Sequence, residues 1–378
     1  MRTLAILAIF AATAFGQRHK PPAVVDAEKP EGKLLQQAMQ ESDPAKKNAL
    51  MEQSANENLK SENAPWVIEN IQAYYVKAGQ PDAVIAWGDK LLVVDPDDPE
   101  PALQALKAAE TKKDTALIKK YGEITARNAK KLAAAPQPKE ADAASWKADV
   151  DYAKQVGQYA EYALFRAAAE SRDPKTTIEL GETLETVSPD SQYAAQARDP
   201  LFLAYRQTGA NDKAIALAEK TLASEQKNED MLLVVSDYYL QQKKEPEKIH
   251  AYSAKVVEIM SAKPKPEGMS DADWNTRKNA VLGLAYFMSG KEYSAENKHP
   301  QTDQQLRKAL PLVESTPALK AETLFLLGLA NYRMAGTSPE RAQDSANFFR
   351  ACSTIKSPFQ AQAGTNLKKI MTEYHGIK

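Results

Sequence analysis

The chain has 378 residues, of which 43% are hydrophobic and 26% charged, and its formal net charge is −1. This composition is typical of a globular protein long enough for two domains or one extended array. The balance of acidic and basic residues argues against a nucleic-acid partner, and a single cysteine, Cys352, excludes an intramolecular disulfide and is predicted to be a buried core residue.

The N-terminal residues 1–16 have the pattern of a signal peptide. Arg2 supplies a positive charge, residues 4–15 are almost all apolar, and small residues precede a predicted cleavage after Gly16. The apolar stretch is shorter than the roughly 20 residues that cross a bilayer as a helix. We therefore expect an exported protein, periplasmic or secreted, with no membrane span after cleavage. An uncleaved anchor is the alternative.

Residues 17–31 carry no periodicity and are predicted to form a flexible arm. From Gly32 onward apolar residues recur at helical spacing and strand signals are absent, which predicts an all-α chain of about fourteen helices. Two Pro-rich stretches divide it into helical segments 32–135, 143–262 and 269–378. The shorter turn signals, which predict antiparallel neighbours, are Ser42-Asp43-Pro44, Ala78 to Asp82, Asp95 to Pro99, Arg172-Asp173-Pro174, Ser188-Pro189-Asp190, Thr208 to Asp212 and Lys243 to Pro246.

A short phrase occurs twice near the C-terminus. A Leu-Gly-Leu-Ala sequence is centred on Gly283 and again on Gly328, each followed by bulky residues. Glycine inside a helix costs about 1 kcal/mol relative to alanine, so its repetition predicts a neighbouring helix too close for a side chain. The polar stretch Lys291 to Gln301 is predicted to be an insertion that explains the wide spacing of the two phrases.

These features together resemble the tetratricopeptide repeat (TPR) family, whose unit is two antiparallel helices. The best match runs from Trp66 through Tyr74, Tyr75, Gly79, Ala83 and Trp87 to Asp95-Pro96. The resemblance covers about two thirds of the chain, and segment 99–170 lacks almost all signature residues. It implies a right-handed solenoid of helical hairpins whose concave groove binds a protein or peptide.

The resemblance also implies which residues line that groove. The expected partner-binding residues are Tyr75, Arg206, Tyr239, Phe287, Tyr332 and Arg333. Tyr74, Tyr238 and Tyr286, one position earlier, are expected to fill the seams between helices, although core packing is an alternative for the whole set. Rigid aromatic side chains with arginines are typical of peptide-binding surfaces.

Residues typical of catalytic chemistry are missing from the pattern. None of the four histidines has Cys, Asp or Glu neighbours at metal-ligand spacing, and nucleotide-binding and nucleophile-elbow motifs are absent. Glu182 and Glu185 are interpreted as solvated helix surface. We therefore expect a non-catalytic scaffold with no metal or cofactor, whose candidate roles are cell-envelope assembly and complex organisation. Two alternatives stay open: an enzyme with a site between segment 99–170 and the solenoid, and a self-associating structural protein.

Overall fold

The computed structural model describes His19, Pro21 and residues 30–139 and 141–377. The chain forms two compact units, one reaching to Thr208 and the other starting at Gly209, and each is considered by itself. The predicted signal peptide, residues 1–16, lies outside the described residues, as does most of the predicted arm, 17–31. Residues 30 and 31 of the predicted arm are helical instead, because the first helix begins at Pro30.

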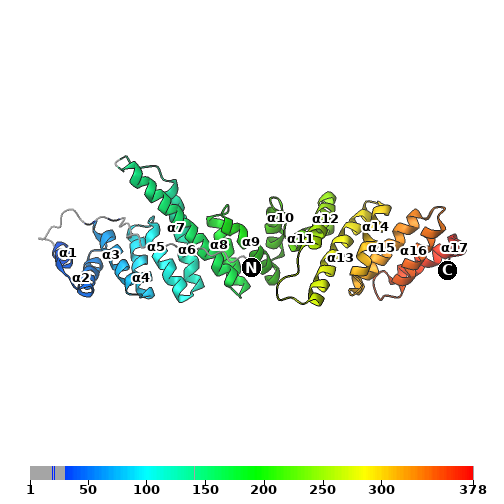
Figure 1. Ribbon diagram of the computed structural model, residues 1–378, viewed down its shortest axis with the longest axis horizontal. Coiled ribbons are helices and arrows are strands. Elements are labelled where there is room, and N and C mark those ends of the chain that lie inside the picture. Colours follow the sequence, from blue (N-terminus) through cyan, green and yellow to red (C-terminus); the bar gives the residue numbers. More distant parts are fainter. Residues whose placement is uncertain (1–18, 20, 22–29, 140, 378) are drawn as a thin grey trace. The chain divides into compact units, whose positions relative to one another are not determined.

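The first unit contains nine helices in its described part (Figure 1). Their bounds are α1 Pro30–Gln40, α2 Pro44–Glu57, α3 Ala64–Lys77, α4 Pro81–Val94, α5 Pro99–Lys112, α6 Thr115–Ala134, α7 Ala143–Glu170, α8 Pro174–Val187 and α9 Gln192–Thr208. The second unit contains α10 Asn211–Leu222, α11 Glu229–Gln242, α12 Pro246–Ala262, α13 Asp271–Ala295, α14 His299–Ala309, α15 Pro317–Ala335, α16 Pro339–Ser353 and α17 Gln360–Glu373, with a 3-10 turn η1 at Leu310–Leu312.

Strands are absent from the described residues, so the prediction of an all-α repeat protein is confirmed, with seventeen α-helices in place of about fourteen. The seven predicted short turns are present, and at three of them an aspartate cap precedes a proline: Asp43-Pro44, Asp98-Pro99 and Asp173-Pro174. Asp43 accepts from two backbone N–H groups at the start of α2, and Asp173 does the same at the start of α8. A carboxylate at this position satisfies N–H groups that the helix cannot, and proline lacks one.

Several turns without glycine or proline were missed, which explains part of the difference in helix number. Between α5 and α6, Lys113 itself takes the left-handed conformation with φ of 55°. Glycine is the usual residue there because a side chain costs roughly 1 kcal/mol in that conformation. The stretch Lys291 to Gln301 is not a separate insertion. Helix α13 continues to Ala295 and α14 starts at His299, so most of the extra residues are helical.

Consecutive helices pack as antiparallel hairpins. Along α13 and then α14 the contacts run in opposite directions, because Gly290 lies against Leu306 whereas Gly283 lies against Val313, just beyond α14. Odd-numbered helices also contact the next odd-numbered helix, from α3 to α9 in the first unit and from α11 to α17 in the second. Each unit is therefore a stack of hairpins with one layer of odd-numbered helices, as expected for a helical repeat.

The repeated glycines lie where two helices touch, as predicted. A Cβ on Gly328 would stand 2.7–2.9 Å from three carbons of the Phe349 ring in α16. A Cβ on Gly283 would stand 3.0 Å from Val313 Cγ1 and 3.1 Å from Leu312 Cβ. These distances are shorter than carbon atoms normally approach, so the missing side chain permits the contact.

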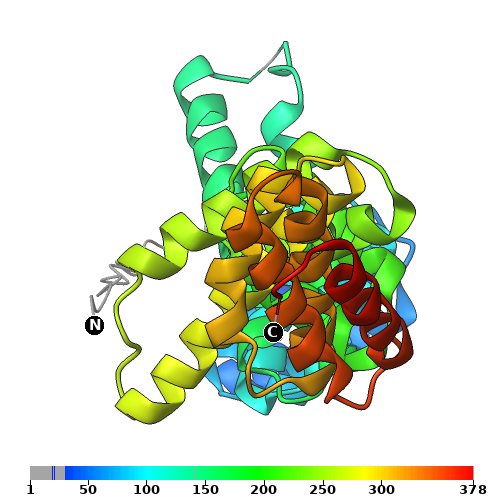
Figure 2. The same ribbon diagram turned by 90° about the vertical axis from the view of Figure 1, so that its right-hand side faces the viewer.

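The hairpin of α6 and α7 is longer than its neighbours. In two views the N-terminal part of α7 and the adjoining end of α6 extend beyond the helices beside them (Figures 1 and 2). This hairpin includes the Pro-rich loop at 135–139, predicted as a boundary between helical segments. The division between the compact units falls instead at Gly209, inside the predicted 143–262 segment, where α9 ends in a glycine turn with φ of 75°.

Candidate functional site

A hydrogen bond between a tyrosine and an acidic residue recurs between neighbouring helices. The acids stand eight residues after the first residues of α2, α4, α8 and α10, namely Pro44, Pro81, Pro174 and Asn211. The bonded pairs are Tyr75 with Glu52, Tyr121 with Asp89, and Tyr205 with Glu182, and Tyr239 has Glu219 as its corresponding acidic neighbour. Burial and the nearby carboxylate both raise the pKa of each phenol, which keeps it a neutral donor.

These bonds change the roles expected of the aromatic residues. Tyr239 and Phe287 are only 4% and 5% exposed and cannot anchor a partner, so their assignment to the groove was wrong. Tyr238, expected in the seam, is half-buried with the Lys244 ammonium 4.3 Å from its ring centre. The side chains of adjacent helical residues point in directions about 100° apart around the helix axis. On α11 the residue expected in the seam and the residue expected at the surface have therefore exchanged places. The same exchange occurs on α13, where Tyr286 is half-buried.

The remaining predicted residues are divided between the two units. Tyr75 is half-buried and its hydroxyl is bonded to Glu52. Tyr332 is half-buried, donates to Glu373 at 2.7 Å and has the Lys369 ammonium 5.2 Å from its ring centre. Arg333 and Arg206 are exposed. Arg206 and Tyr75 belong to the first unit, the others to the second.

A different group of aromatic residues is brought together in the first unit, on helices α7 and α9. Three aromatic rings from two helices meet. The ring centre of Tyr193 in α9 lies 5.6 Å from that of Tyr162 and 6.1 Å from that of Phe165, both in α7. The Arg166 guanidinium lies 5.8 Å from the Tyr162 ring centre. All four side chains are half-buried. We call Tyr162, Phe165, Arg166 and Tyr193 the aromatic–arginine surface.

Glu110 of α5 fixes the Arg166 side chain of this surface. Its two carboxylate oxygens accept from Arg166 at 2.8 Å and from the Tyr159 hydroxyl at 2.5 Å, and the carboxylate is 11% exposed. Burial and the Glu110 charge raise the pKa of Tyr159, so its hydroxyl stays protonated and donates. Arg166 is thereby fixed, yet its side chain is 43% exposed, and the bond to Glu110 uses one of its five N–H donors.

The acidic residues of segment 99–170 that lie near this surface are engaged in contacts between helices. The predicted enzyme alternative needed carboxylates of perturbed pKa converging near segment 99–170. The carboxylates of Glu100 and Glu110 there each accept a tyrosine hydroxyl, from Tyr152 and Tyr159 respectively. Both are engaged in fixing α7 to α5. Glu182 and Glu185 are not simply solvated either, because Glu182 binds Tyr205 and Glu185 binds Arg198 at 2.8 Å.

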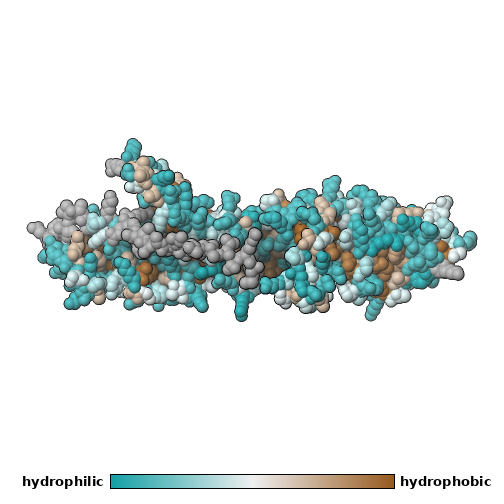
Figure 3. Space-filling model, viewed as in Figure 1, coloured by the Kyte–Doolittle hydropathy of each residue, from teal (hydrophilic) through white to brown (hydrophobic). Residues whose placement is uncertain are grey.

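The surface drawn in Figure 3 is mostly hydrophilic, with hydrophobic residues in separate patches. Along the part of the chain that the structure describes, no helix has the length and apolar character needed to cross a membrane. Small apolar patches among polar residues are typical of non-obligate contact surfaces, whose anchors are a few aromatic and arginine residues.

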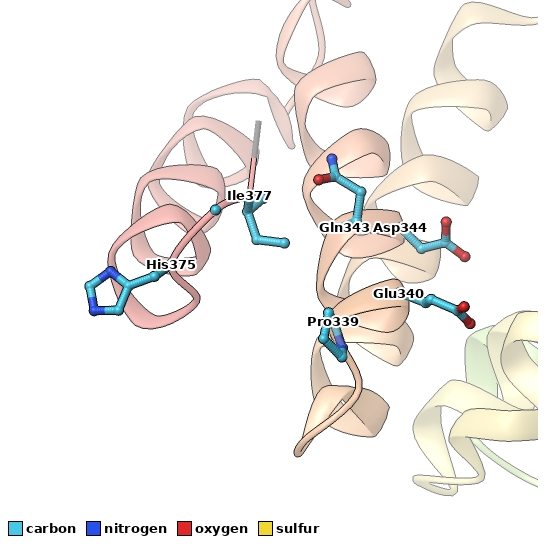
Figure 4. A pocket seen from close by; sticks show the side chains of 7 residues that line it. Pro339, Glu340, Gln343, Asp344, His375 and Ile377 are labelled. Atoms are coloured by element: carbon cyan, nitrogen blue, oxygen red, sulfur yellow. The ribbon is translucent and has the colours of Figure 1, made fainter.

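A shallow hollow in the second unit lies between α16 and the C-terminal residues. Figure 4 shows the Ile377 side chain directed toward α16, whereas the His375 ring points away from α16 and the Glu340 and Asp344 carboxylates point to the opposite side of that helix. Asp344 is engaged by Arg307 at 2.5 Å. These side chains do not converge, so the hollow has no arrangement suited to catalysis or metal binding.

Two further residues of interest are a histidine and the cysteine. His19 lies beside Asp95 and Asp98, although no acidic residue stands at metal-ligand spacing from it in the sequence. Sequence spacing cannot show partners 76 and 79 positions apart. Cys352 is fully buried and donates to the Ala321 carbonyl at 3.3 Å, as predicted for a core residue. Burial raises its pKa to about 11, which suppresses the reactive thiolate.

Comparison with known proteins adds little beyond the fold. No family model matches the sequence, and no curated protein does. Among solved structures, the chain is similar to the TPR domain of P58(IPK), with 11% identity over 90% of this chain and 96% of that chain and a TM-score of 0.25. It is also similar to yeast Tom70, with 13% identity over 92% and 89% and a TM-score of 0.24. At these values the function must be argued from the residues.

Proposed function

We propose that the protein is a non-catalytic scaffold that binds a segment of a protein or peptide partner at the aromatic–arginine surface of α7 and α9. The observation that supports this is the fixed position of Arg166 beside three half-buried rings. Tyr and Arg in such a setting supply contact area and directed donors at little entropic cost, because their rotamers are already held. We further propose that the chain acts after export, as residues 1–16 suggest.

The surface suits a particular kind of segment. An apolar or planar side chain of the partner would stack on Tyr162 and Tyr193, while a carboxylate or backbone carbonyl would accept from the free edge of Arg166. Glu110 remains bonded to Arg166 beneath, so the guanidinium does not have to reorient on binding. Preorganisation of this kind reduces the free-energy cost of association.

Selection from a random peptide library displayed on phage tests this proposal. We expect peptides selected on the wild-type chain to lose at least tenfold in affinity for Tyr162→Ala and for Arg166→Ala. The matched control is Tyr238→Ala in the second unit, because Tyr238 is also half-buried beneath a cation, and it should bind normally. If selected peptides bind Tyr162→Ala and Arg166→Ala as well as wild type, the surface is not the binding site.

A further inference from the structure

His19 and the turn between α4 and α5 bring together three groups that commonly bind metal ions. The His19 Nε2 atom lies 3.3 Å from Asp98 Oδ2 and 3.6 Å from Asp95 Oδ2. All three ligand atoms lie within 4.8 Å of one another. An imidazole nitrogen with two carboxylate oxygens is a donor set that suits zinc.

The spacing of these atoms fits a shared cation. Tetrahedral zinc with bonds of about 2.0–2.1 Å holds its ligand atoms about 3.3–3.4 Å apart. The two distances from Nε2 to the carboxylate oxygens are close to that separation between ligand atoms. In addition, Nε2 is buried and makes no hydrogen bond of regular geometry among the described residues, although its 3.3 Å separation from Asp98 Oδ2 also allows an ion pair when the imidazole is protonated. A cation between the three groups would satisfy it.

The site is built on a rigid turn. Asp98 caps α5 by accepting the Glu100 N–H through Oδ1, which leaves Oδ2 directed toward His19. The buried amide of Asn128 donates to the carbonyls of Pro96 at 2.8 Å and Asp98 at 3.1 Å, which ties the turn to α6. Outer contacts of this type orient metal ligands and strengthen binding.

The histidine is held in place separately. Its backbone N–H donates to Glu69 of α3 at 3.2 Å, and its side chain is 16% exposed, whereas the Asp98 side chain is 2% exposed. The ligands thus come from two parts of the chain, with Asp98 and Asp95 in a fixed turn and His19 far before them in the sequence.

We propose that His19, Asp95 and Asp98 bind one zinc ion, with water completing the coordination, and that this ion fastens the N-terminal segment to the α4–α5 turn. His19 and Asp95 are 76 positions apart, so the metal would close a long chain loop and hold His19 against the α4–α5 turn. The site shares no residue with the aromatic–arginine surface, so its test does not depend on peptide binding there.

Calorimetric titration of the metal-free full chain with zinc chloride at neutral pH tests this site. We expect one zinc per chain and at least tenfold weaker binding by His19→Ala and Asp98→Asn. Asparagine remains a good helix cap, so Asp98→Asn removes the charge while preserving the start of α5. The controls His375→Ala and Asp97→Asn remove an exposed histidine and an exposed carboxylate and should bind like wild type.

Trypsin provides an independent readout of the fastening. Zinc should slow cleavage of the Arg18–His19 bond in the wild-type chain, EDTA should reverse this, and Asp98→Asn should show no such protection. Magnesium, which prefers six oxygen ligands, should not substitute. The proposal is overturned if zinc does not bind stoichiometrically, if binding survives in His19→Ala and Asp98→Asn, or if zinc does not change cleavage.

Discussion

Adding one methyl group at Gly328 tests whether the repeated glycines exist for helix contact. The new Cβ of Gly328→Ala would lie 2.7–2.9 Å from the Phe349 ring, which is 1% exposed and also packs against Phe325 at 5.8 Å between ring centres. Overpacking of this kind costs about 2 kcal/mol, whereas alanine gains about 1 kcal/mol in helix propensity. The expected result is a net loss of about 1 kcal/mol.

Gly364 in α17 is the matched control in the same unit. A Cβ built there meets no atom within 4 Å, and its backbone is helical. Gly364→Ala should therefore stabilise the unit by up to about 1 kcal/mol, from propensity alone. The two substitutions are chemically identical and should have opposite signs.

Pulsed labelling of Cys352 in urea measures these changes in the second unit. Cys352 is the sole cysteine and is buried in the same cluster as Phe349, so its labelling reports unfolding of that cluster. The urea midpoint should fall for Gly328→Ala and rise for Gly364→Ala. If Gly328→Ala raises the midpoint as much as Gly364→Ala, close helix contact does not explain the glycine.

Three other predictions follow from the polar contacts. Tyr205→Phe removes the 2.7 Å bond to Glu182 and should lower the free energy of unfolding by about 1–2 kcal/mol; urea titration followed by circular dichroism would show no change if the bond is unimportant. Burial opposes ionisation of Asp303, but bonds from Asn331 and Arg341 outweigh it and lower its pKa, so its stabilisation is present above about pH 4 and lost on further acidification. Asp303→Asn should therefore flatten the loss of stability in acid, and an unchanged acid limb would contradict this. With its pKa raised to about 11, Cys352 at pH 8 has roughly two hundredfold less thiolate than a free cysteine, so a disulfide reagent should label the native chain far more slowly than the unfolded chain; equal rates would show that the thiol is accessible.

Local signals predicted the helices well because they act over a few residues. The Asp43-Pro44 and Asp173-Pro174 pairs start helices through caps that need no tertiary contact. The turn at Lys113 could not be predicted in this way, because a lysine takes the left-handed conformation that normally indicates glycine. Its conformation is imposed by the packing of α5 and α6.

The site residues were harder to predict because two adjacent aromatic residues do not reveal which one faces the core. Tyr238 and Tyr239 are chemically equivalent in the sequence, and only the position of Glu219 on the preceding helix draws Tyr239 inward. A usable signal was present: acids follow small residues in Gly88-Asp89, Gly181-Glu182 and Ala218-Glu219. The approach of Tyr193 to Tyr162, by contrast, depends on how α7 and α9 stack.

Site-specific photo-cross-linking in the native cell tests the proposed binding surface most directly. A photoreactive amino acid would replace Gln158, which is exposed one turn before Tyr162 on α7, or, as a control, the exposed Lys130 on α6. We predict a discrete protein adduct from position 158 that disappears with Arg166→Ala and is not formed from position 130. Equal adducts from both positions, or an adduct from 158 that persists with Arg166→Ala, would contradict the assignment of this surface.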